Sequence, residues 1–349
     1  MSEINDILLR MKTNHLQSIP SGILRAADLL RAGEAIAIPT ETVYGLAANA
    51  LCESAVAKIF AAKGRPADNP LIVHVLSLDD IAPLVKDPPS SLLISLSCFM
   101  PGPLTVVLPK SDNVPKIVSG GLNSVAIRIP AHPVARAVLA KTGLPLAAPS
   151  ANRSGSPSPT RARHVLDDMN GRIAAVLDGG ECSVGVESTV LSLTDNVPEI
   201  LRPGAVTAEQ LRDVLGDVRV AQSVLSALEE GQAATSPGMK YRHYAPQAQV
   251  ILLRGDSNAF ARWCNTRSCV ALCFAEDVKH LHIPYYCYGA RKDYGTQARL
   301  LFDALRTLDE LAGVSSAPLI TAHAPEPEGV GLAVYNRLLR AAEFQVMDL

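Results

Sequence analysis

Short apolar runs alternate with amphipathic segments along the first two hundred residues. The runs are continuous or alternate with polar residues, and several end at proline or glycine, a pattern typical of β-strands. They cover residues 35–40, 71–76, 104–109, 124–130, 144–150, 174–179, 188–193 and 199–204. Because some of these strands follow one another without a helix between them, we expect a mixed sheet rather than a purely parallel one.

Three segments between these strands have apolar residues at helical spacing. They cover residues 22–33, 54–64 and 133–143, and each ends at a glycine. A glycine at that position readily adopts the left-handed conformation that ends many helices. We therefore predict three amphipathic helices, each terminating at its glycine.

The pattern changes after residue 216. Residues 226–237 are rich in alanine, glutamate, glycine and serine and lack a strand pattern, which favours a linker. Further on, strand-like and helical runs alternate again, which predicts a smaller α/β unit with a parallel sheet flanked by helices. These runs cover residues 248–255, 268–274, 295–313, 317–323 and 329–342. We assign residues 1–216 to a first domain, 217–247 to a linker and 248–349 to a second domain.

Composition narrows the class of protein. The 349 residues are 48% apolar and 19% charged with a formal net charge of −2, which fits a globular protein and disfavours a dedicated duplex-binding protein. We expect neither a signal peptide nor a transmembrane segment, because the longest apolar stretch, residues 91–100, is far shorter than the roughly twenty residues that cross a bilayer. Because the net charge is slightly negative, any anion-binding site must be formed by a local cluster of basic residues.

The seven cysteines favour a cytoplasmic protein with reduced thiols, because they are odd in number and scattered among apolar residues. Cys264, Cys269 and Cys273, with His280 and His282 nearby, are of the residue types that bind zinc. However, no C-x-x-C pair occurs, and two of these cysteines lie in a predicted strand. We expect no protein-bound metal.

The segment "KGRPADNPLIVHV" (63–75) carries two cations and a histidine at one helix-to-strand connection. Lys63, near the end of the predicted helix, complements the helix dipole, whereas Arg65 lies beyond the glycine cap and has no such role. His74 lies in the next strand, where a lone histidine is usually a structural residue. Together the three residues favour a pocket for a phosphate-sized anion.

Hydroxyl-bearing and basic residues adjoin several other predicted strands. The stretch "IPTETVYGLAANA" (38–50) is interpreted as a strand and a turn into a helix with a threonine cap, although its hydroxyls also suit a small polar ligand at a strand end. Arg128 shares a strand face with Ser124, and a loop of small polar residues and prolines follows at 145–160. The two common nucleotide-binding signatures, G-x-x-x-x-G-K-[ST] and G-x-G-x-x-G, do not occur.

The segment "SPGMKYRHYAP" (236–246) places cations and aromatic rings inside the expected linker. An inert linker is made of small and flexible residues, whereas these side chains can stack on a base or bind phosphates. We interpret this segment as an active-site lid that folds over a ligand.

Eight motifs, taken in order, resemble the threonylcarbamoyl-AMP synthases in their long two-domain form. They are "PTETVYGL", "KGRPADNPLIVHV", "MPGPLTVVL", "VAIRIPAHP", "APSANRSGSPSPT", "VESTVL", "LRPGAV" and "SPGMKYRHYAP". The resemblance implies a YrdC-like catalytic α/β domain, with a twisted mixed sheet, helices and a concave basic pocket, and a smaller Rossmann-like parallel α/β domain. It covers residues from about 20 to 246 and leaves the role of the first twenty residues open.

The resemblance implies an L-threonylcarbamoyladenylate synthase, a nucleotidyltransferase that joins L-threonine, bicarbonate and ATP and releases pyrophosphate. This is the first step of N6-threonylcarbamoyladenosine formation in tRNAs that decode ANN codons, and a separate transferase complex takes the product. Mg²⁺ is implied with ATP, whereas direct contact with tRNA is left open.

By the same matching, Lys63 and Arg65 are implied as catalytic residues. The implied ATP site consists of Lys63, Arg65, Asn69, Ser124, Ser150, Asn152, Ser158, Arg202, His243 and Tyr244. The implied threonine site consists of Thr42, His74, Arg128, Ser188 and the backbone around Ala148. A carbamate about 4 Å from the α-phosphate is repelled by roughly 4 kcal/mol at an effective dielectric near 20, which the basic residues are expected to offset.

Two other functions are compatible with parts of the sequence. An RNA-binding module would grip tRNA on a basic surface, but the net charge of −2 and the lack of a long basic stripe disfavour it. A carbamoyltransferase-type domain would form a carbamoyl adenylate from carbamoyl phosphate. Relatives of that kind carry an acylphosphatase unit and paired C-x-x-C motifs, neither of which is found here.

Overall fold

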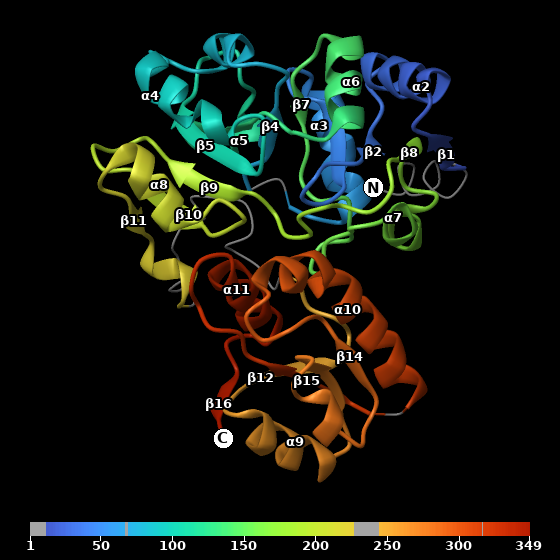
Figure 1. The fold of residues 1–349 in the computed structure, drawn as a ribbon. Coiled ribbons are helices and arrows are strands. Elements are labelled where there is room, and N and C mark those ends of the chain that lie inside the picture. The colour runs from blue at the N-terminus through green and yellow to red at the C-terminus, as the bar shows by residue number, and fades with distance from the viewer. Residues whose placement is uncertain (1–11, 67–68, 227–243, 316) are drawn as a thin grey trace.

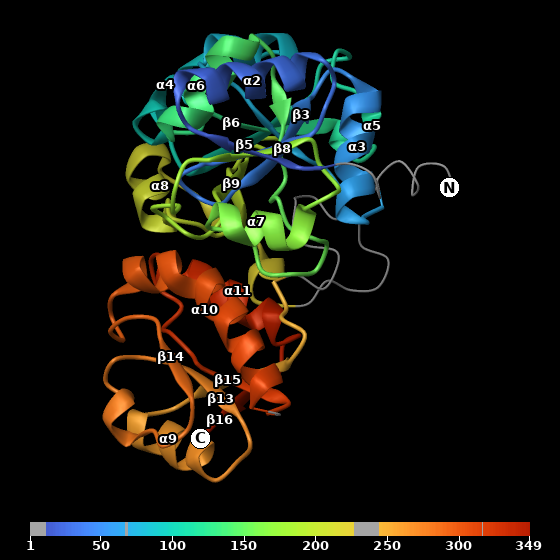
Figure 2. The same cartoon turned by 90° about the vertical axis from the view of Figure 1, so that its right-hand side faces the viewer.

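The computed structural model describes residues 12–66, 69–226, 244–315 and 317–349. They form two α/β bodies, one from residues before 227 and one from residues after 243, packed against each other (Figures 1 and 2). Among these residues, no helix is both long enough and apolar enough to cross a membrane.

The first body is built around a sheet of eleven strands within the described residues. In spatial order these are β1 (Asn14–Gln17), β8 (Ala175–Asp178), β2 (Ile36–Ile38), β3 (Gly45–Asn49), β7 (Leu146–Ala147), β4 (Ile72–His74), β6 (Ser124–Arg128), β5 (Leu104–Pro109), β9 (Thr189–Ser192), β10 (Glu199–Arg202) and β11 (Arg219–Val220). Parallel pairs such as β4 with β6 stand beside antiparallel pairs such as β5 with β6, so the predicted mixed sheet is confirmed.

Helices cover this sheet on both sides. Helices α2 (Pro20–Arg31) and α6 (Pro133–Thr142) pack on Ile36 and Ile38, whereas Ala37 faces the opposite side, where α3 (Glu53–Lys63) lies. This alternation is what a strand buried on both faces requires. The remaining helices of this body are η1 (Asp79–Leu84), α4 (Ser90–Ser95), η2 (Leu96–Phe99), α5 (Lys116–Ser119), α7 (Ala162–Met169), α8 (Ala208–Leu215) and η3 (Gln222–Val224).

The predicted glycine caps are confirmed at two of the three helices, whereas α2 ends at Arg31 with Ala32 rather than Gly33 as its C-cap. Gly64 ends α3 and Gly143 ends α6, each with a φ of 63°. Because glycine has no Cβ, it adopts this left-handed conformation without strain. At α3 this cap ends the helix between Lys63, its last residue, and Arg65, which follows the glycine.

The segment 38–50 differs from our expectation of a helix. After β2 the chain passes through a loop and enters β3, which pairs antiparallel with β2. Gly45 pairs with Ile38, and a Cβ at Gly45 would lie 3.2 Å from the Ala148 side chain. The small residues of β3 therefore serve close packing between strands, which overrides their preference for a helix.

The second body has a five-stranded sheet within the described residues, and every strand pair in it is parallel. Its order is β14 (Tyr285–Cys287), β13 (Val270–Cys273), β15 (Leu319–His323), β12 (Gln249–Arg254) and β16 (Val346–Asp348). Helix α9 (Ser257–Asn265) and η4 (Val278–His280) adjoin one face, whereas α10 (Tyr294–Val314) and α11 (Gly331–Ala341) lie on the face toward the first body (Figure 1). The expected parallel α/β domain is confirmed.

The first sheet extends beyond residue 216, where we placed the end of the first domain. Strand β11 pairs in parallel with β10, so residues 219 and 220 belong to the first sheet rather than to a linker. Most of the expected linker and lid, residues 227–243, lies outside the described residues.

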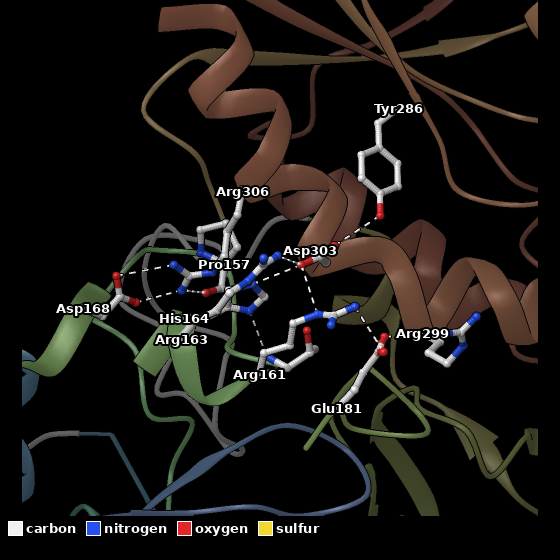
Figure 3. A network of polar contacts seen from close by, with 11 residues as sticks. Pro157, Arg161, Arg163, His164, Asp168, Glu181, Tyr286, Arg299, Asp303 and Arg306 are labelled. Carbon is white, nitrogen blue, oxygen red and sulfur yellow. Dashed lines mark hydrogen bonds and ion pairs between the residues drawn. The ribbon is translucent and has the colours of Figure 1, made fainter. Parts of the chain in front are cut away.

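A polar network joins the two bodies (Figure 3). Asp303 of α10 accepts hydrogen bonds from Arg163 at 2.7 Å and from Tyr286 at 3.2 Å, and it lies 3.1 Å from His164. A second ion pair joins Arg306 of α10 to Asp168 of α7 at 2.7 Å. The hydrogen bond with His164, followed by the one from Arg163, holds the pKa of Asp303 well below its usual range despite partial burial.

Replacing Asp303 with asparagine is expected to weaken this interface. The change leaves Arg163 and His164 without a carboxylate partner. We expect the free energy of unfolding to fall by about 1–2 kcal/mol. The loss is smaller than for a fully buried charged hydrogen bond, because Arg163 is largely exposed to solvent. A carboxylate with a lowered pKa stabilises the folded state above its unfolded pKa of about 3.9 and loses that effect as pH falls toward its folded value. Urea denaturation from pH 7 downward measures this difference.

The matched control is Asp195→Asn, which changes an exposed carboxylate in the loop after β9. We expect no change in unfolding for this variant. Equal unfolding free energies for Asp303→Asn and wild type at pH 7 would contradict the role of Asp303 at the interface.

Candidate active site

A cavity opens at one end of the first sheet, where β4, β6 and β10 end and β9 begins. Sites at strand ends are common in open α/β sheets, because loops of different strands converge there. Its lining residues are Thr40, Thr42, Val43, Gly45, Lys63, Arg65, Ile72, His74, Arg128, Ala148, Pro149, Ser150, Asn152, Ser154, Gly155, Glu187, Ser188, Arg202 and Tyr244.

Lys63 is a buried cation held by backbone oxygens. Its Nζ donates hydrogen bonds to the carbonyl oxygens of Ser150 at 2.5 Å and Asn152 at 2.7 Å. Burial, and then the neighbouring charge of Arg65, lowers the pKa of Lys63 to about 7. An anion in the cavity would favour the charged form of this lysine.

Arg128 is fixed by a carboxylate on the loop after β2. Its guanidinium donates to Glu41 at 2.6 Å, to the Thr42 hydroxyl at 2.8 Å and to the Gly102 carbonyl at 3.2 Å. Burial alone would raise the pKa of Glu41, but the charge and hydrogen bond of Arg128 lower it below its usual range. Three of the five N–H groups of Arg128 serve these contacts, so two others can bind a ligand.

His74 is the strand partner of Arg128, since the two residues lie opposite each other in the β4–β6 ladder. Burial, and then the charge of Arg128, lowers the pKa of His74 to about 3. The histidine is therefore neutral at physiological pH, and it can hydrogen-bond a ligand without adding charge to the site.

A second buried carboxylate, Glu187, also lines the cavity. It accepts hydrogen bonds from the Ser158 hydroxyl and, at 3.0 Å, from Arg337 of the second body. Burial would raise the pKa of Glu187, but Arg337 and Arg202 hold it below its usual range. Arg202 in turn donates to the Ser188 carbonyl oxygen at 3.0 Å.

Several buried polar atoms around the site have no hydrogen-bond partner among the described residues. They are both amide atoms of Asn69, Nδ1 of His74 and Oδ1 of Asn152. Buried polar groups are nearly always paired in folded proteins. Their concentration here indicates a pocket whose polar lining is completed by a ligand.

Most of the residues that the resemblance implied lie around this one cavity. Those that line it are Thr42, Lys63, Arg65, His74, Arg128, Ala148, Ser150, Asn152, Ser188, Arg202 and Tyr244. Asn69 and Ser158 are buried but do not line it. Ser124 begins β6, roughly 13 Å along the strand from Arg128, and does not line it either. His243 lies outside the described residues.

Sequence reasoning assigned no role to Glu41, Glu187 or Arg337. Glu41 and Glu187 lie within motifs of the resemblance, but nothing in their sequence neighbourhood indicates the arginines they pair with. Within the described residues, no group of three or more histidine, cysteine, aspartate or glutamate side chains is placed to hold a metal ion.

Two family descriptions together match most of the chain. One, named for Sua5, YciO and YrdC and described as "Telomere recombination", matches residues 28–204. The other, described as "Threonylcarbamoyl-AMP synthase, C-terminal domain", matches residues 206–343.

Individual relatives match over nearly their whole length. The threonylcarbamoyl-AMP synthase of Pyrococcus abyssi is 44% identical, over 93% of this chain and 95% of the relative. The Bacillus subtilis threonylcarbamoyl-AMP synthase is 42% identical, over 96% of this chain and 97% of the relative. The crystal structure of P. abyssi Sua5 complexed with L-threonine superposes with a TM-score of 0.87 at 40% identity, over 97% of this chain and 99% of that one.

Proposed function

This chain belongs to the threonylcarbamoyl-AMP synthase family, and we propose that its active site is the cavity at the ends of β4, β6 and β10. The enzyme makes threonylcarbamoyl-AMP from L-threonine, bicarbonate and ATP with release of pyrophosphate, the first step of N6-threonylcarbamoyladenosine formation in tRNA. The convergence of Lys63, Arg65, Arg128 and Arg202 on one cavity carries this proposal.

The ATP end of the cavity is proposed to lie around Lys63 and Arg65. Asn152, Arg202 and Tyr244 border the same space, and the two amide atoms of the nearby Asn69 lack partners among the described residues. Glu187 already binds arginine, as does Glu41. We therefore propose that Mg²⁺ enters as part of the ATP complex, bound mainly by the phosphates.

The threonine end is proposed to lie around Arg128 and His74. The two remaining N–H groups of Arg128 suit a carboxylate, and the neutral His74 and the hydroxyls of Thr42 and Ser188 suit the amine and side-chain hydroxyl of threonine. The complex of P. abyssi Sua5 with L-threonine supports a threonine site in this fold.

The main task of the protein in this reaction is to bring two anions close together. The neutral threonine amine adds to carbon dioxide with loss of a proton, or to bicarbonate with loss of water, to give a carbamate. A carbamate oxygen then attacks the α-phosphorus of ATP as the bond to pyrophosphate breaks. Glu41 neutralises the charge of Arg128. We therefore propose that Lys63 and Arg65, with a smaller contribution from Arg202, offset most of the repulsion between the two anions. Positioning and fixed charge account for the rate enhancement, as in phosphoryl transfer generally.

The charge of Lys63 is expected to appear in the pH dependence of the enzyme. Because its folded pKa is about 7, the free enzyme loses this charge as pH rises through neutrality, and kcat/KM for ATP should fall with it. Lys63→Arg keeps the charge over the whole range, so the ratio of wild-type to variant kcat/KM should decline between pH 6 and 9. A ratio that is constant with pH would contradict this role, and taking the ratio cancels the ionisation of the substrates.

The proposed reaction is tested by incubating the protein with L-threonine, bicarbonate, ATP and Mg²⁺. Mass spectrometry should detect threonylcarbamoyl-AMP, and a coupled assay should detect pyrophosphate in equal amount. Omitting bicarbonate should abolish both signals. Pyrophosphate release without the mixed anhydride would contradict the proposal.

The partners and the compartment are proposals that follow from the product. A mixed anhydride is labile in water, so we propose that a tRNA threonylcarbamoyl transferase complex takes it up directly. A cytoplasmic location agrees with seven cysteines that are all unpaired. Filter binding of tRNA, with ATP as competitor, measures whether the enzyme itself contacts tRNA.

A further inference from the structure

Segment 150–158 of the first domain supplies part of the wall of the proposed ATP site. Its residues that line the cavity are Ser150, Asn152, Ser154 and Gly155. The same segment holds Lys63, because the carbonyl oxygens of Ser150 and Asn152 accept the hydrogen bonds of its Nζ. A shift of this segment would therefore move the cavity wall and the buried cation together.

Three successive carbonyl groups, those of residues 155–157, anchor this segment. The Gly155 oxygen accepts a hydrogen bond at 2.9 Å from the backbone N–H of Ala245. The Ser156 oxygen accepts one at 2.7 Å from the side chain of Asn152. The third carbonyl group is bound from the second domain.

Arg306 of α10 binds this third carbonyl group, that of Pro157. Its Nη2 donates to the Pro157 oxygen at 2.5 Å, and the same guanidinium pairs with Asp168 at 2.7 Å (Figure 3). Pro157 is buried, and the side chain of Arg306 is only 15% exposed. A buried carbonyl oxygen is costly to leave without a donor. Without Arg306, the segment would have to move for this oxygen to find another partner.

One face of α10 carries Arg306 together with Phe302 and Asp309, since residues three or four apart lie on the same side of a helix. The Phe302 ring packs on the ring of Tyr244, which lines the cavity, at 5.3 Å between centroids. Asp309 accepts hydrogen bonds at 2.9 Å from the backbone N–H groups of residues 247 and 248. This face therefore binds both the segment at the proposed ATP site and the chain that enters the second domain.

We propose that Arg306 of the second domain is a positioning residue of the active site: through the Pro157 carbonyl group it holds segment 150–158 in the conformation that binds the phosphates of ATP. This inference rests on the proposed ATP site. It gives the second domain a direct part in ATP binding, because the segment that Arg306 fixes is the one that holds Lys63.

The test compares Arg306→Met, which keeps a long apolar side chain without donors, with the matched control Arg299→Met. Arg299 lies on the same helix and also pairs across the interface, with Glu181 at 3.3 Å, but neither of these two residues lines the cavity (Figure 3). For Arg306→Met, KM for ATP should rise about tenfold while KM for threonine changes less than about twofold, because the proposed threonine site does not include segment 150–158. For Arg299→Met, both constants should stay within about twofold of wild type.

Limited digestion with trypsin reports on the segment independently of catalysis. Arg153 is exposed within it, so the rate of cleavage after this residue, identified by mass spectrometry, measures how firmly the segment is held. The rate should be at least about threefold higher in Arg306→Met than in Arg299→Met. Circular dichroism checks the fold of each variant. If Arg306→Met does not fold, Arg306→Lys serves in its place, with a smaller rise in KM for ATP expected because lysine still supplies one donor.

Three results would overturn the inference. These are a KM for ATP in Arg306→Met within about twofold of that in Arg299→Met, a parallel rise of both KM values in Arg306→Met, and equal rates of cleavage after Arg153 in the two variants. Failure of the wild-type protein to form threonylcarbamoyl-AMP would instead count against the proposed function, so the two failures are distinguishable.

Discussion

Replacing Arg65 with alanine is expected to lower kcat/KM for ATP by about 100- to 1,000-fold, the loss typical for removing one group that stabilises transition-state charge. Arg65 follows the left-handed Gly64, lines the cavity beside Lys63 and lies only partly exposed. Its side chain is not part of the hydrophobic core, so the fold should persist. Steady-state release of pyrophosphate measures the effect, and circular dichroism checks the fold.

The matched control for this variant is Arg25→Ala, which removes an exposed arginine from α2 on the far side of the sheet from α3. We expect it to retain wild-type turnover. Turnover of Arg65→Ala within about threefold of wild type would show that Arg65 does not contact the reacting phosphates.

Replacing Arg128 with alanine is expected to affect threonine binding and stability together. Threonine affinity should fall at least about 30-fold, because truncating one member of a buried charge pair typically costs 2 kcal/mol or more. The free energy of unfolding should fall by about 3–5 kcal/mol, since Glu41 is left as a buried carboxylate without its cation. Calorimetric titration with L-threonine and with a non-hydrolysable ATP analogue measures the binding, and ATP affinity should change much less.

The double variant Glu41→Gln/Arg128→Met separates the two effects. It removes the charge of Glu41 together with that of Arg128, so the free energy of unfolding should return most of the way to the wild-type value. Threonine binding should stay weak. Recovery of threonine binding in this double variant, or a larger loss for ATP than for threonine, would contradict a threonine-binding role for Arg128.

Local patterns in the sequence account for much of the fold. Strands such as β5 and β6 were predictable because their apolar residues alternate or run together over a few positions, and the end of α3 was predictable from Gly64. Strand β3 was not predictable in this way, since alanine and glycine carry no strand preference of their own. Its conformation comes from pairing with β2, which no local window contains.

The residues of the site likewise divide into those that the sequence predicts and those that it does not. Lys63, Arg65 and His74 could be recognised because they cluster around one helix-to-strand connection, where Arg65 lies beyond the glycine cap and has no role in the helix. The pairs of Glu41 with Arg128 and Glu187 with Arg337 could not, because their members lie 87 and 150 residues apart. These two pairs set the balance of charge in the cavity, so the electrostatics of the site follow only from the three-dimensional structure.

The account depends on ATP and threonine lying side by side in one cavity. A crystal structure of the protein with L-threonine and a non-hydrolysable ATP analogue tests this directly. We predict the threonine carboxylate within hydrogen-bonding distance of Arg128 and the triphosphate within hydrogen-bonding distance of Lys63 and Arg65. Ligands bound in separate places, or a triphosphate that contacts neither of these cations, would contradict the account.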